Sequence, residues 1–285
     1  MRVFRTVQQM RKFSDSIAKK GRKTAFVPTM GCLHEGHLSL IETARKEADA
    51  VVVSIFVNPV QFGQNEDFSK YPRTEEEDLK ACRKAGVSAV FLPAVTEIFP
   101  EGFSTYVSEE SRSNGLCGAF RPGHFRGVAT IVLMLFNIVR PHVAIFGQKD
   151  AQQAAVLRKM AADLFIPVKI RVAPVSREAD GLARSSRNRY LSAGERAVAS
   201  ELYAALQAGR AAAHASGLQL HPRIITDAVA THLARHPQFK TQYIALVDAE
   251  TMRPVQGPVS PKEERLVLAA AVHLGKTRLI DNILL

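Results

Sequence analysis

Residues 24–57 read TAFVPTMGCLHEGHLSLIETARKEADAVVVSIFV, and the class of fold follows from this stretch. An apolar segment at residues 24–29 is followed by a polar turn that contains glycine, and then by helical periodicity over residues 38–48. The stretch ends in a β-branched run at residues 51–57, which is typical of a strand buried on both faces. A strand, a helix and a second strand in this order are the repeating unit of a parallel sheet.

The same alternation continues as far as residue 172. Residues 74–85 predict a charged helix, with Thr74 as its cap and Glu77 completing a capping box. Further elements are predicted at residues 87–92, 127–139, 143–146, 151–163 and 168–172, of which the first, third and fifth are strands. Repeated units of this length predict an α/β fold with a Rossmann-like, doubly wound parallel sheet, in which ligands bind beyond the carboxyl ends of the strands.

The pattern changes near residue 176. A polar stretch is followed by two helical patterns and three strand candidates, at residues 193–213, 224–236, 242–248, 265–272 and 278–283. A chain of 285 residues is also longer than most single domains. We therefore predict a Rossmann-like domain over residues 1–175 and a smaller α+β domain over residues 176–285.

Cysteine usage and apolar patterning favour the cytoplasm. The three cysteines, Cys32, Cys82 and Cys117, are widely separated and form no CxxC pair, so neither a disulfide framework nor a zinc site is expected. The first residues, MRVFRTVQQMRKF, lack the apolar core of a signal peptide. The longest apolar run, at residues 128–139, is too short for a bilayer and predicts a buried helix. We expect a cytoplasmic protein with no membrane partner.

The formal net charge of +11 admits nucleic acid, a membrane surface or small anions as partners. The positive residues are scattered, and neither an arginine-rich tail nor a basic stripe interleaved with aromatic residues is present. This distribution favours a basic surface with an anion-binding pocket. A nucleic-acid-binding module is the more distant alternative.

The segment after the first strand, PTMGCLHEGH at residues 28–37, carries two histidines at the start of the predicted helix. His34 and His37 are three residues apart and therefore share one helix face. A helix N-terminus offers free N–H groups and a positive dipole end, which favour phosphate. Two imidazoles there could donate hydrogen bonds to the α-phosphate of a nucleotide, whereas the spacing excludes the HExxH motif of metalloproteases. Two surface histidines are the alternative reading.

Two further segments carry polar side chains beside predicted elements. In residues 58–63, NPVQFG, the neutral amide of Gln61 could orient a carboxylate or hydroxyl, although it could also be a loop side chain in solvent. Residues 121–127, RPGHFRG, precede the apolar helix, where Arg126 or His124 could face a phosphate. A capping and packing loop explains the second segment equally well.

Residues 146–153, FGQKDAQQ, again join a strand to a helix. Lys149 is a mobile positive charge suited to phosphate oxygens. Asp150 is expected mainly as the N-cap of the helix. Gln153 could face the pocket beside Gln61.

Residues 185–190, SSRNRY, lie at the predicted domain junction. Two hydroxyls followed by Arg187 form a plausible phosphate clamp, and a polar linker is the alternative. The candidates for Mg²⁺ are Asp67, Glu77 and Asp78, although a residue of this kind is more often a solvated surface charge. No GxxxxGK[ST] loop, kinase signature or nucleophile elbow occurs in the sequence. Together the five segments favour nucleotide-dependent group transfer.

In this order the five segments resemble the pantothenate synthetase family of the HxGH nucleotidyltransferase superfamily. The most specific strings lie at residues 28–37, 58–63, 71–74, 147–153 and 185–190. The resemblance covers most of the chain. It implies an ATP-dependent ligase that joins pantoate to β-alanine through pantoyl adenylate, with release of pyrophosphate and AMP. It also implies Mg²⁺ and a homodimer.

The resemblance further implies roles for individual residues. His34, His37 and Lys149 would be catalytic and would stabilise the phosphates during adenylation. Gln61 and Gln153 would bind pantoate. The ATP site would also include Met30, Gly147, Asp150, Ser185, Ser186 and Arg187.

Asp78 would lie near the metal ion. The sequence departs from the family pattern at Arg184, where the family usually has Met, at Ala151, where an aromatic residue is common, and at Cys32, where Ala is frequent. These departures affect substrate fit and metal ligation but leave the reaction class unchanged. The nearer alternative is another nucleotidyltransferase of the HxGH type, acting on a different small acid or phosphate.

Overall fold

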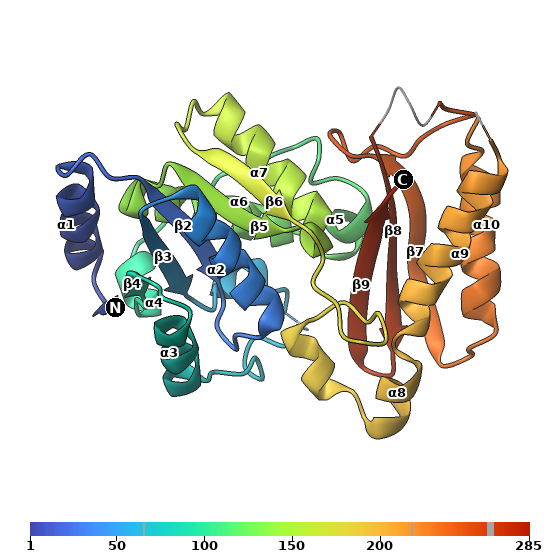
Figure 1. Ribbon diagram of the computed structural model, residues 1–285, viewed down its shortest axis with the longest axis horizontal. Coiled ribbons are helices and arrows are strands. Elements are labelled where there is room, and N and C mark those ends of the chain that lie inside the picture. The colour runs from blue at the N-terminus through green and yellow to red at the C-terminus, as the bar shows by residue number, and fades with distance from the viewer. Residues whose placement is uncertain (65, 218, 261–264) are drawn as a thin grey trace.

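The computed structural model describes residues 1–64, 66–217, 219–260 and 265–285, which form two sheets surrounded by helices (Figure 1). The larger sheet has six strands in the order β1-β4-β3-β2-β5-β6, and the smaller has three in the order β7-β8-β9. The strands are β1 (Arg2–Phe4), β2 (Thr24–Thr29), β3 (Ala50–Ile55), β4 (Ala89–Phe91), β5 (Val143–Gly147), β6 (Lys169–Ala173), β7 (Phe239–Asp248), β8 (Leu266–Leu274) and β9 (Thr277–Leu284). All pairs in the larger sheet are parallel and both pairs in the smaller one are antiparallel.

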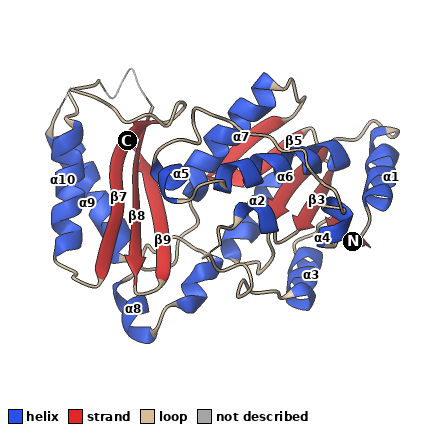
Figure 2. Cartoon of the chain, turned by 180° about the vertical axis from the view of Figure 1, so that it is seen from behind, coloured by secondary structure: helices blue, strands red, loops and turns tan. Residues whose placement is uncertain are grey.

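The larger sheet is the middle of three layers. Helices α2 (Glu35–Glu47) and α3 (Glu75–Lys84) cover one face, whereas α1 (Val7–Ala18), α6 (His124–Val139) and α7 (Ala151–Asp163) cover the other. Figures 1 and 2 show α2 and α6 on opposite sides of the sheet. The apolar sequence of α6 follows from its burial between the sheet and other helices. The short helices α4 (Val95–Ile98) and α5 (Leu116–Phe120) lie in the connection from β4 to α6.

The strand order reverses between β2 and β5. The chain proceeds outward from β2 through β3 to β4 on one side, and from β5 to β6 on the other. The loops that leave the carboxyl ends of β2 and β5 therefore diverge and open a crevice, which is the usual ligand site of such sheets. His34 follows β2 and Lys149 follows β5.

The C-terminal part packs against the side of the larger sheet. Helices α9 (Glu201–Ala215) and α10 (Pro222–Ala234) bury one face of the smaller sheet in a common apolar cluster. The opposite face packs on α7, where Ala155 shares a cluster with Val247 and Val267. None of the helices within the described ranges is both long and apolar enough to cross a membrane.

The predicted fold class is confirmed, with local corrections. The single helix predicted at residues 193–213 is wrong, because the chain forms α8 (Ala193–Val198) and α9, separated at Ala199 and Ser200. The capping box at Thr74 is also wrong: its ψ of 53° departs from extended backbone, and among the described residues its side chain makes no capping hydrogen bond. Strand β1 and helices α1, α4 and α5 were not predicted. The domain boundary between residues 175 and 176 stays a prediction.

Candidate active site

A cavity of about 230 Å³ lies in the crevice between the loops that follow β2 and β5. The segment after β6, including the 3₁₀ turn Ser186–Tyr190, closes one side of it. The structure brings the residues predicted for ATP and pantoate to this cavity, whose lining includes Met30, His34, His37, Gln61, Gly147, Lys149, Asp150, Gln153, Ser185, Ser186 and Arg187. Segments that are far apart in the sequence therefore meet around one volume.

His34 and His37 open helix α2 and cap it together. His34 is the N-cap residue, and its Nδ1 accepts a hydrogen bond from the backbone N–H of Gly36 at 3.1 Å. The Nδ1 of His37 accepts one from the backbone N–H of His34 at 3.3 Å. Since a backbone N–H can only donate, both Nδ1 atoms are unprotonated and each neutral ring carries its proton on Nε2. Each ring thus keeps one donor for a ligand.

The histidine pair is uncharged near neutral pH. Burial lowers the pKa of His34 to about 4, and the cations Lys149 and Arg184 act in the same direction. Burial, together with His34 and Lys149, lowers the pKa of His37 to about 3. The cavity therefore combines neutral imidazole donors with the separate positive charge of Lys149.

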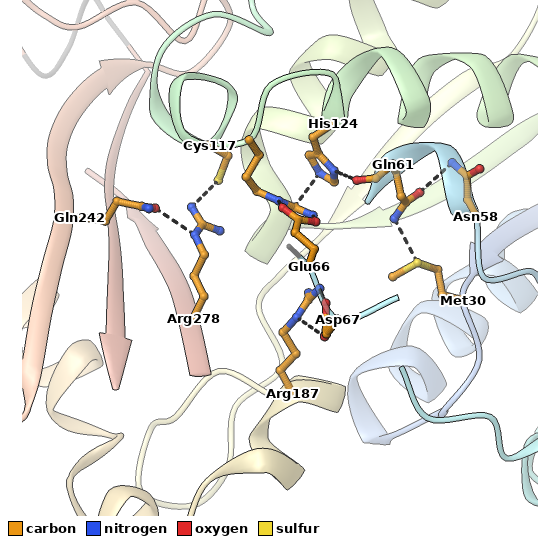
Figure 3. Close-up of polar contacts among 11 residues, drawn as sticks. Met30, Asn58, Gln61, Glu66, Asp67, Cys117, His124, Arg187, Gln242 and Arg278 are labelled. Carbon is orange, nitrogen blue, oxygen red and sulfur yellow. Dashed lines mark hydrogen bonds and ion pairs between the residues drawn. The ribbon is translucent and has the colours of Figure 1, made fainter. Parts of the chain in front are cut away.

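Gln61 is held by contacts to both ends of its side chain (Figure 3). Its Nε2 donates to the sulfur of Met30 at 3.0 Å, and its Oε1 accepts from Asn58 Nδ2 at 3.1 Å. Its backbone carbonyl accepts from Nδ1 of His124 at 2.9 Å. The amide therefore has a defined orientation at the cavity wall.

His124 is neutral as well, but in the opposite tautomer from His34. Its Nδ1–H donates to the carbonyl of Gln61, and its Nε2 accepts from Arg121 Nη1 at 2.9 Å. Arginine can only donate, so Nε2 has no proton. Burial, followed by the charge of Arg121, lowers the pKa of His124 to about 4. The predicted role of His124 as a phosphate donor is therefore wrong, because both ring nitrogens are already used within the protein.

Acid should destabilise the fold through these three rings. His34, His37 and His124 have lowered pKa values in the folded chain, whereas an unfolded histidine titrates near about 6.5. Below that pH these histidines are protonated in the unfolded chain but stay neutral in the folded chain. The free energy of unfolding therefore falls as the pH decreases. Each ring contributes up to about 1.4 kcal/mol per pH unit. Urea unfolding at about pH 7 and about pH 5 measures the effect, and an unchanged midpoint would contradict it.

Gly127 allows helix α6 to approach the turn that carries Gln61. A Cβ on Gly127 would lie 2.5 Å from the carbonyl oxygen of Val60 and 2.7 Å from Cα of Gln61, both of which are backbone atoms. The carbonyl of Gly127 also accepts a hydrogen bond from Asn58 Nδ2 at 3.1 Å. Asn58 therefore binds Gln61 and α6 with one amide group.

Gly127→Ala should lower both stability and affinity for the ligand of Gln61. The added methyl group forces backbone apart, which typically costs about 1–3 kcal/mol. The matched control is Gly194→Ala in helix α8, where the described atoms leave the space within 4 Å of the new Cβ open; there alanine should be neutral or stabilising. Urea unfolding and substrate KM test this prediction. Equal behaviour of the two variants would refute the packing argument.

The loop that carries Lys149 is held by hydrogen bonds from strand β9 of the C-terminal part. Nδ2 of Asn282, on β9, donates to the carbonyls of Gln148 and Lys149, at 2.9 Å each. The side chain of Gln148 donates a hydrogen bond to Asn282 Oδ1 at 2.9 Å, so the two side chains bind each other.

The carboxylate of Asp150 pairs with the neighbouring ammonium, since Lys149 Nζ lies 3.5 Å from Asp150 Oδ1. Asp150 occupies the predicted N-cap position of α7, but in the described structure its carboxylate makes no capping bond.

Two arginines at the cavity form ion pairs with carboxylates of the loop after residue 61, and Figure 3 shows the pair of Arg187 and Asp67. Arg187 donates to both oxygens of Asp67, at 3.1 and 2.9 Å. Arg121 donates to both oxygens of Glu66, at 2.7 and 2.6 Å. Such bidentate pairs define the orientation of the guanidinium. A phosphate that binds Arg187 must therefore share it with Asp67 or displace Asp67.

Asp78 lies outside the cavity and shapes the loop before α2. Its oxygens accept hydrogen bonds from the backbone N–H groups of Cys32 and Leu33, at 2.9 and 2.7 Å. This carboxylate is buried, and burial raises its pKa although the backbone bonds oppose the change. Both oxygens are thus engaged by the protein, which corrects the prediction of Asp78 as a metal ligand. Glu77, the neighbouring candidate, is exposed.

The sequence interpretation missed Asn58, Asn282 and the real role of Asp78. Asn58 stands directly after a predicted strand and before Pro59, a position where asparagine often makes side-chain hydrogen bonds to backbone, so a signal was present. Asn282 lies in an ordinary strand sequence, RLIDNIL, which contains no such signal. Its role depends on the packing of β9 against the loop after β5.

Comparisons with known proteins point to one family. The chain matches the family model described as pantoate-beta-alanine ligase over residues 2–284. It is 49% identical to a pantothenate synthetase of Thermotoga neapolitana over 100% of both chains. It is 46% identical to a pantothenate synthetase of Moorella thermoacetica over 100% of this chain and 99% of the other.

Solved structures of full-length relatives are similar too. The crystal structure of pantothenate synthetase from Thermus thermophilus matches with a TM-score of 0.90 and 43% identity, covering 99% of each chain. The pantoate-beta-alanine ligase of Francisella tularensis, solved in complex with beta-gamma ATP and beta-alanine, matches with a TM-score of 0.80 and 33% identity. That match covers 100% of this chain and 97% of the other.

Proposed function

The chain belongs to the pantoate–β-alanine ligase family, and from this premise we propose how its cavity carries out the reaction. The enzyme condenses pantoate with β-alanine using ATP. In the first proposed step a carboxylate oxygen of pantoate attacks the α-phosphorus of ATP, and pyrophosphate leaves. In the second, the amine of β-alanine attacks the acyl carbon of pantoyl adenylate, which releases AMP and gives pantothenate.

His34 and His37 bind the phosphates in this proposal. Both lie at the N-terminus of α2, where backbone dipoles favour an anion, and both have an Nε2–H donor available. The α-phosphate gains negative charge on its oxygens as the carboxylate attacks. Preorganised donors aimed at that charge stabilise the transition state without having to reorient.

Lys149 provides the positive charge on the transferring phosphate. It reaches the cavity from the other side of the crevice, in the loop after β5. Ser185, Ser186 and Arg187 extend the phosphate site toward the leaving pyrophosphate. Met30, Gly147 and Asp150 complete the nucleotide site.

Gln61 and Gln153 hold pantoate against an apolar wall. The cavity lining includes Phe56, Val128 and Ile131, which suit the two methyl groups of pantoate. The two amides can bind its hydroxyl and carboxylate groups while leaving one carboxylate oxygen nucleophilic. No covalent enzyme intermediate is needed, since catalysis rests on positioning and charge stabilisation.

The donor set of the cavity fits Mg²⁺ bound mainly through ATP. Mg²⁺ takes few protein ligands and keeps several waters, and Asp150 is the one carboxylate among the described cavity-lining residues. Asp150 and the phosphate oxygens would hold the ion, which neutralises charge on the departing pyrophosphate when bound.

We further propose that the enzyme is cytoplasmic and that it forms a homodimer. Light scattering of the purified protein measures its molar mass and so tests the homodimer.

The observation that carries the proposal is the convergence of His34, His37 and Lys149 on one cavity at the strand-order reversal. Exchange of radiolabelled pyrophosphate into ATP, measured without β-alanine, isolates the first step. We expect exchange that requires pantoate. Exchange with another small acid but not with pantoate would instead support a different nucleotidyltransferase, and a lack of exchange with every acid would refute the adenylate.

A further inference from the structure

A second cluster of titratable side chains lies outside the cavity, where helices α9 and α10 meet. Glu201 is the first residue of α9, His232 lies in the last turn of α10, and His236 follows the end of α10. The two helices run side by side at the end of the molecule opposite α1 (Figure 1), and they share one apolar cluster. None of these three residues lines the cavity described above.

The ligand atoms of the cluster converge on a small volume. Glu201 Oε2 lies 2.8 Å from His232 Nε2 and 3.3 Å from His236 Nε2. The three atoms lie within 4.8 Å of one another. Both imidazoles lie at the C-terminal end of α10, where the rings stack with an interplanar angle of 29°. The side chains are 21–33% exposed, so solvent can reach them.

We propose that Glu201, His232 and His236 bind a divalent transition-metal ion, for which Zn²⁺ is the best match. Zn²⁺ takes imidazole nitrogen and carboxylate oxygen in tetrahedral sites with bonds of about 2.0–2.2 Å, which sets its ligand atoms roughly 3.3–3.5 Å apart. The contact between His236 and Glu201 already has this spacing. The contact between His232 and Glu201 must lengthen by about half an ångström to match it. Water takes the fourth position.

The donor set distinguishes this site from a magnesium site. Two imidazoles are poor ligands for Mg²⁺, which prefers carboxylate, carbonyl and water oxygens. A cluster that only stabilises the helices is the competing explanation, since a carboxylate at the start of α9 and imidazoles at the end of α10 both complement the helix dipoles. That explanation predicts no specific metal affinity. Metal binding instead joins the two helices and stabilises the folded chain without changing the cavity.

Titration of the chelator-treated, full-length protein with Zn²⁺ tests the site by calorimetry and by thermal unfolding. We expect saturable binding and a Zn²⁺-dependent rise in Tm, because a ligand that binds the folded state stabilises it. Glu201→Gln and His236→Gln should weaken the binding at least about tenfold, since even the loss of an outer-shell partner typically costs 10–100-fold. His214→Gln, which changes an exposed histidine of α9, should leave the binding unchanged.

His34 and His37 form another imidazole pair, so the test depends on differences between the wild type and the variants. Equal Zn²⁺ affinity and equal Tm shifts in the wild type and Glu201→Gln would overturn the proposal. Histidine NMR signals of the wild-type protein give a result that does not depend on any variant folding. We expect the imidazole signals of His232 and His236 to shift on addition of Zn²⁺, and shifts confined to other histidines would also overturn it.

Discussion

His34→Ala should slow the formation of pantoyl adenylate by a factor of about one hundred or more. The Nε2–H of His34 is the donor that we assign to the α-phosphate, and the loss of one preorganised donor of this kind typically costs about 10²–10³ in rate. Burial and the charge of Lys149 lower the pKa of His34 to about 4, so the variant loses a hydrogen bond rather than a charge. Single-turnover measurement of adenylate with ATP and pantoate reports this step directly.

His34→Asn is the matched control for that variant. His34 Nδ1 caps α2 through the N–H of Gly36, so alanine also removes a cap that typically contributes about 1 kcal/mol. Asparagine keeps a side-chain acceptor for the cap but lacks the reach of the imidazole Nε2. We expect the asparagine variant to unfold like the wild type and to react as slowly as the alanine variant. A wild-type rate in His34→Asn would mean that His34 acts only as a cap.

Lys149→Met should have an effect of similar or greater size. Methionine retains most of the length of the side chain but removes the ammonium that we assign to the transferring phosphate. Charge stabilisation in a water-poor site contributes about as much as an oxyanion-hole donor, or roughly 10²–10³ in rate. If the ammonium acts mainly in the transition state, kcat should fall with little change in the KM for ATP. Steady-state kinetics with ATP varied separate these two parameters.

Lys159→Met is the control for net charge. Lys159 lies on α7 in the same part of the chain, pairs with Asp163 at the surface and does not line the cavity. Both substitutions lower the positive charge by one, but we expect only Lys149→Met to slow the reaction. A comparable loss in both variants would attribute the effect to the overall field of the protein and would remove Lys149 from the site.

Local patterns in the sequence were sufficient to predict five of the six strands of the larger sheet, all except β1. Residues 24–29 and 151–163 were predicted with the bounds that β2 and α7 have in the structure. The patterns are reliable there because strands buried on both faces are continuously apolar, and a buried helix repeats its apolar positions every three or four residues. Helix α1 was missed in a charged segment, although Met10, Phe13 and Ile17 have helical spacing and are buried.

The polar contacts of the site were harder to predict. Asp78 was expected to bind a metal ion, but its oxygens bind the backbone of Cys32 and Leu33, which lie more than forty residues earlier in the chain. Asn282 fastens the loop of Lys149 across a sequence separation of 133 residues. A carboxylate or an amide is polar in any environment, so its residue type alone does not indicate which partner it will meet.

The sequence by itself therefore determined five strands of the parallel sheet, the two histidines at the start of α2 and the basic and amide side chains after the strands. These features are local, because they depend on the spacing of residues along a single element or turn. Only the tertiary structure decided that β2 and β5 are neighbours, which brings His34 and Lys149 to one cavity. It also decided that Asp67 pairs with Arg187. In addition, it decided that α6 packs at Gly127 directly against the backbone of Gln61. The physical reason is that such contacts depend on how whole elements pack, and packing optimises the total burial and hydrogen bonding of distant segments rather than any local pattern.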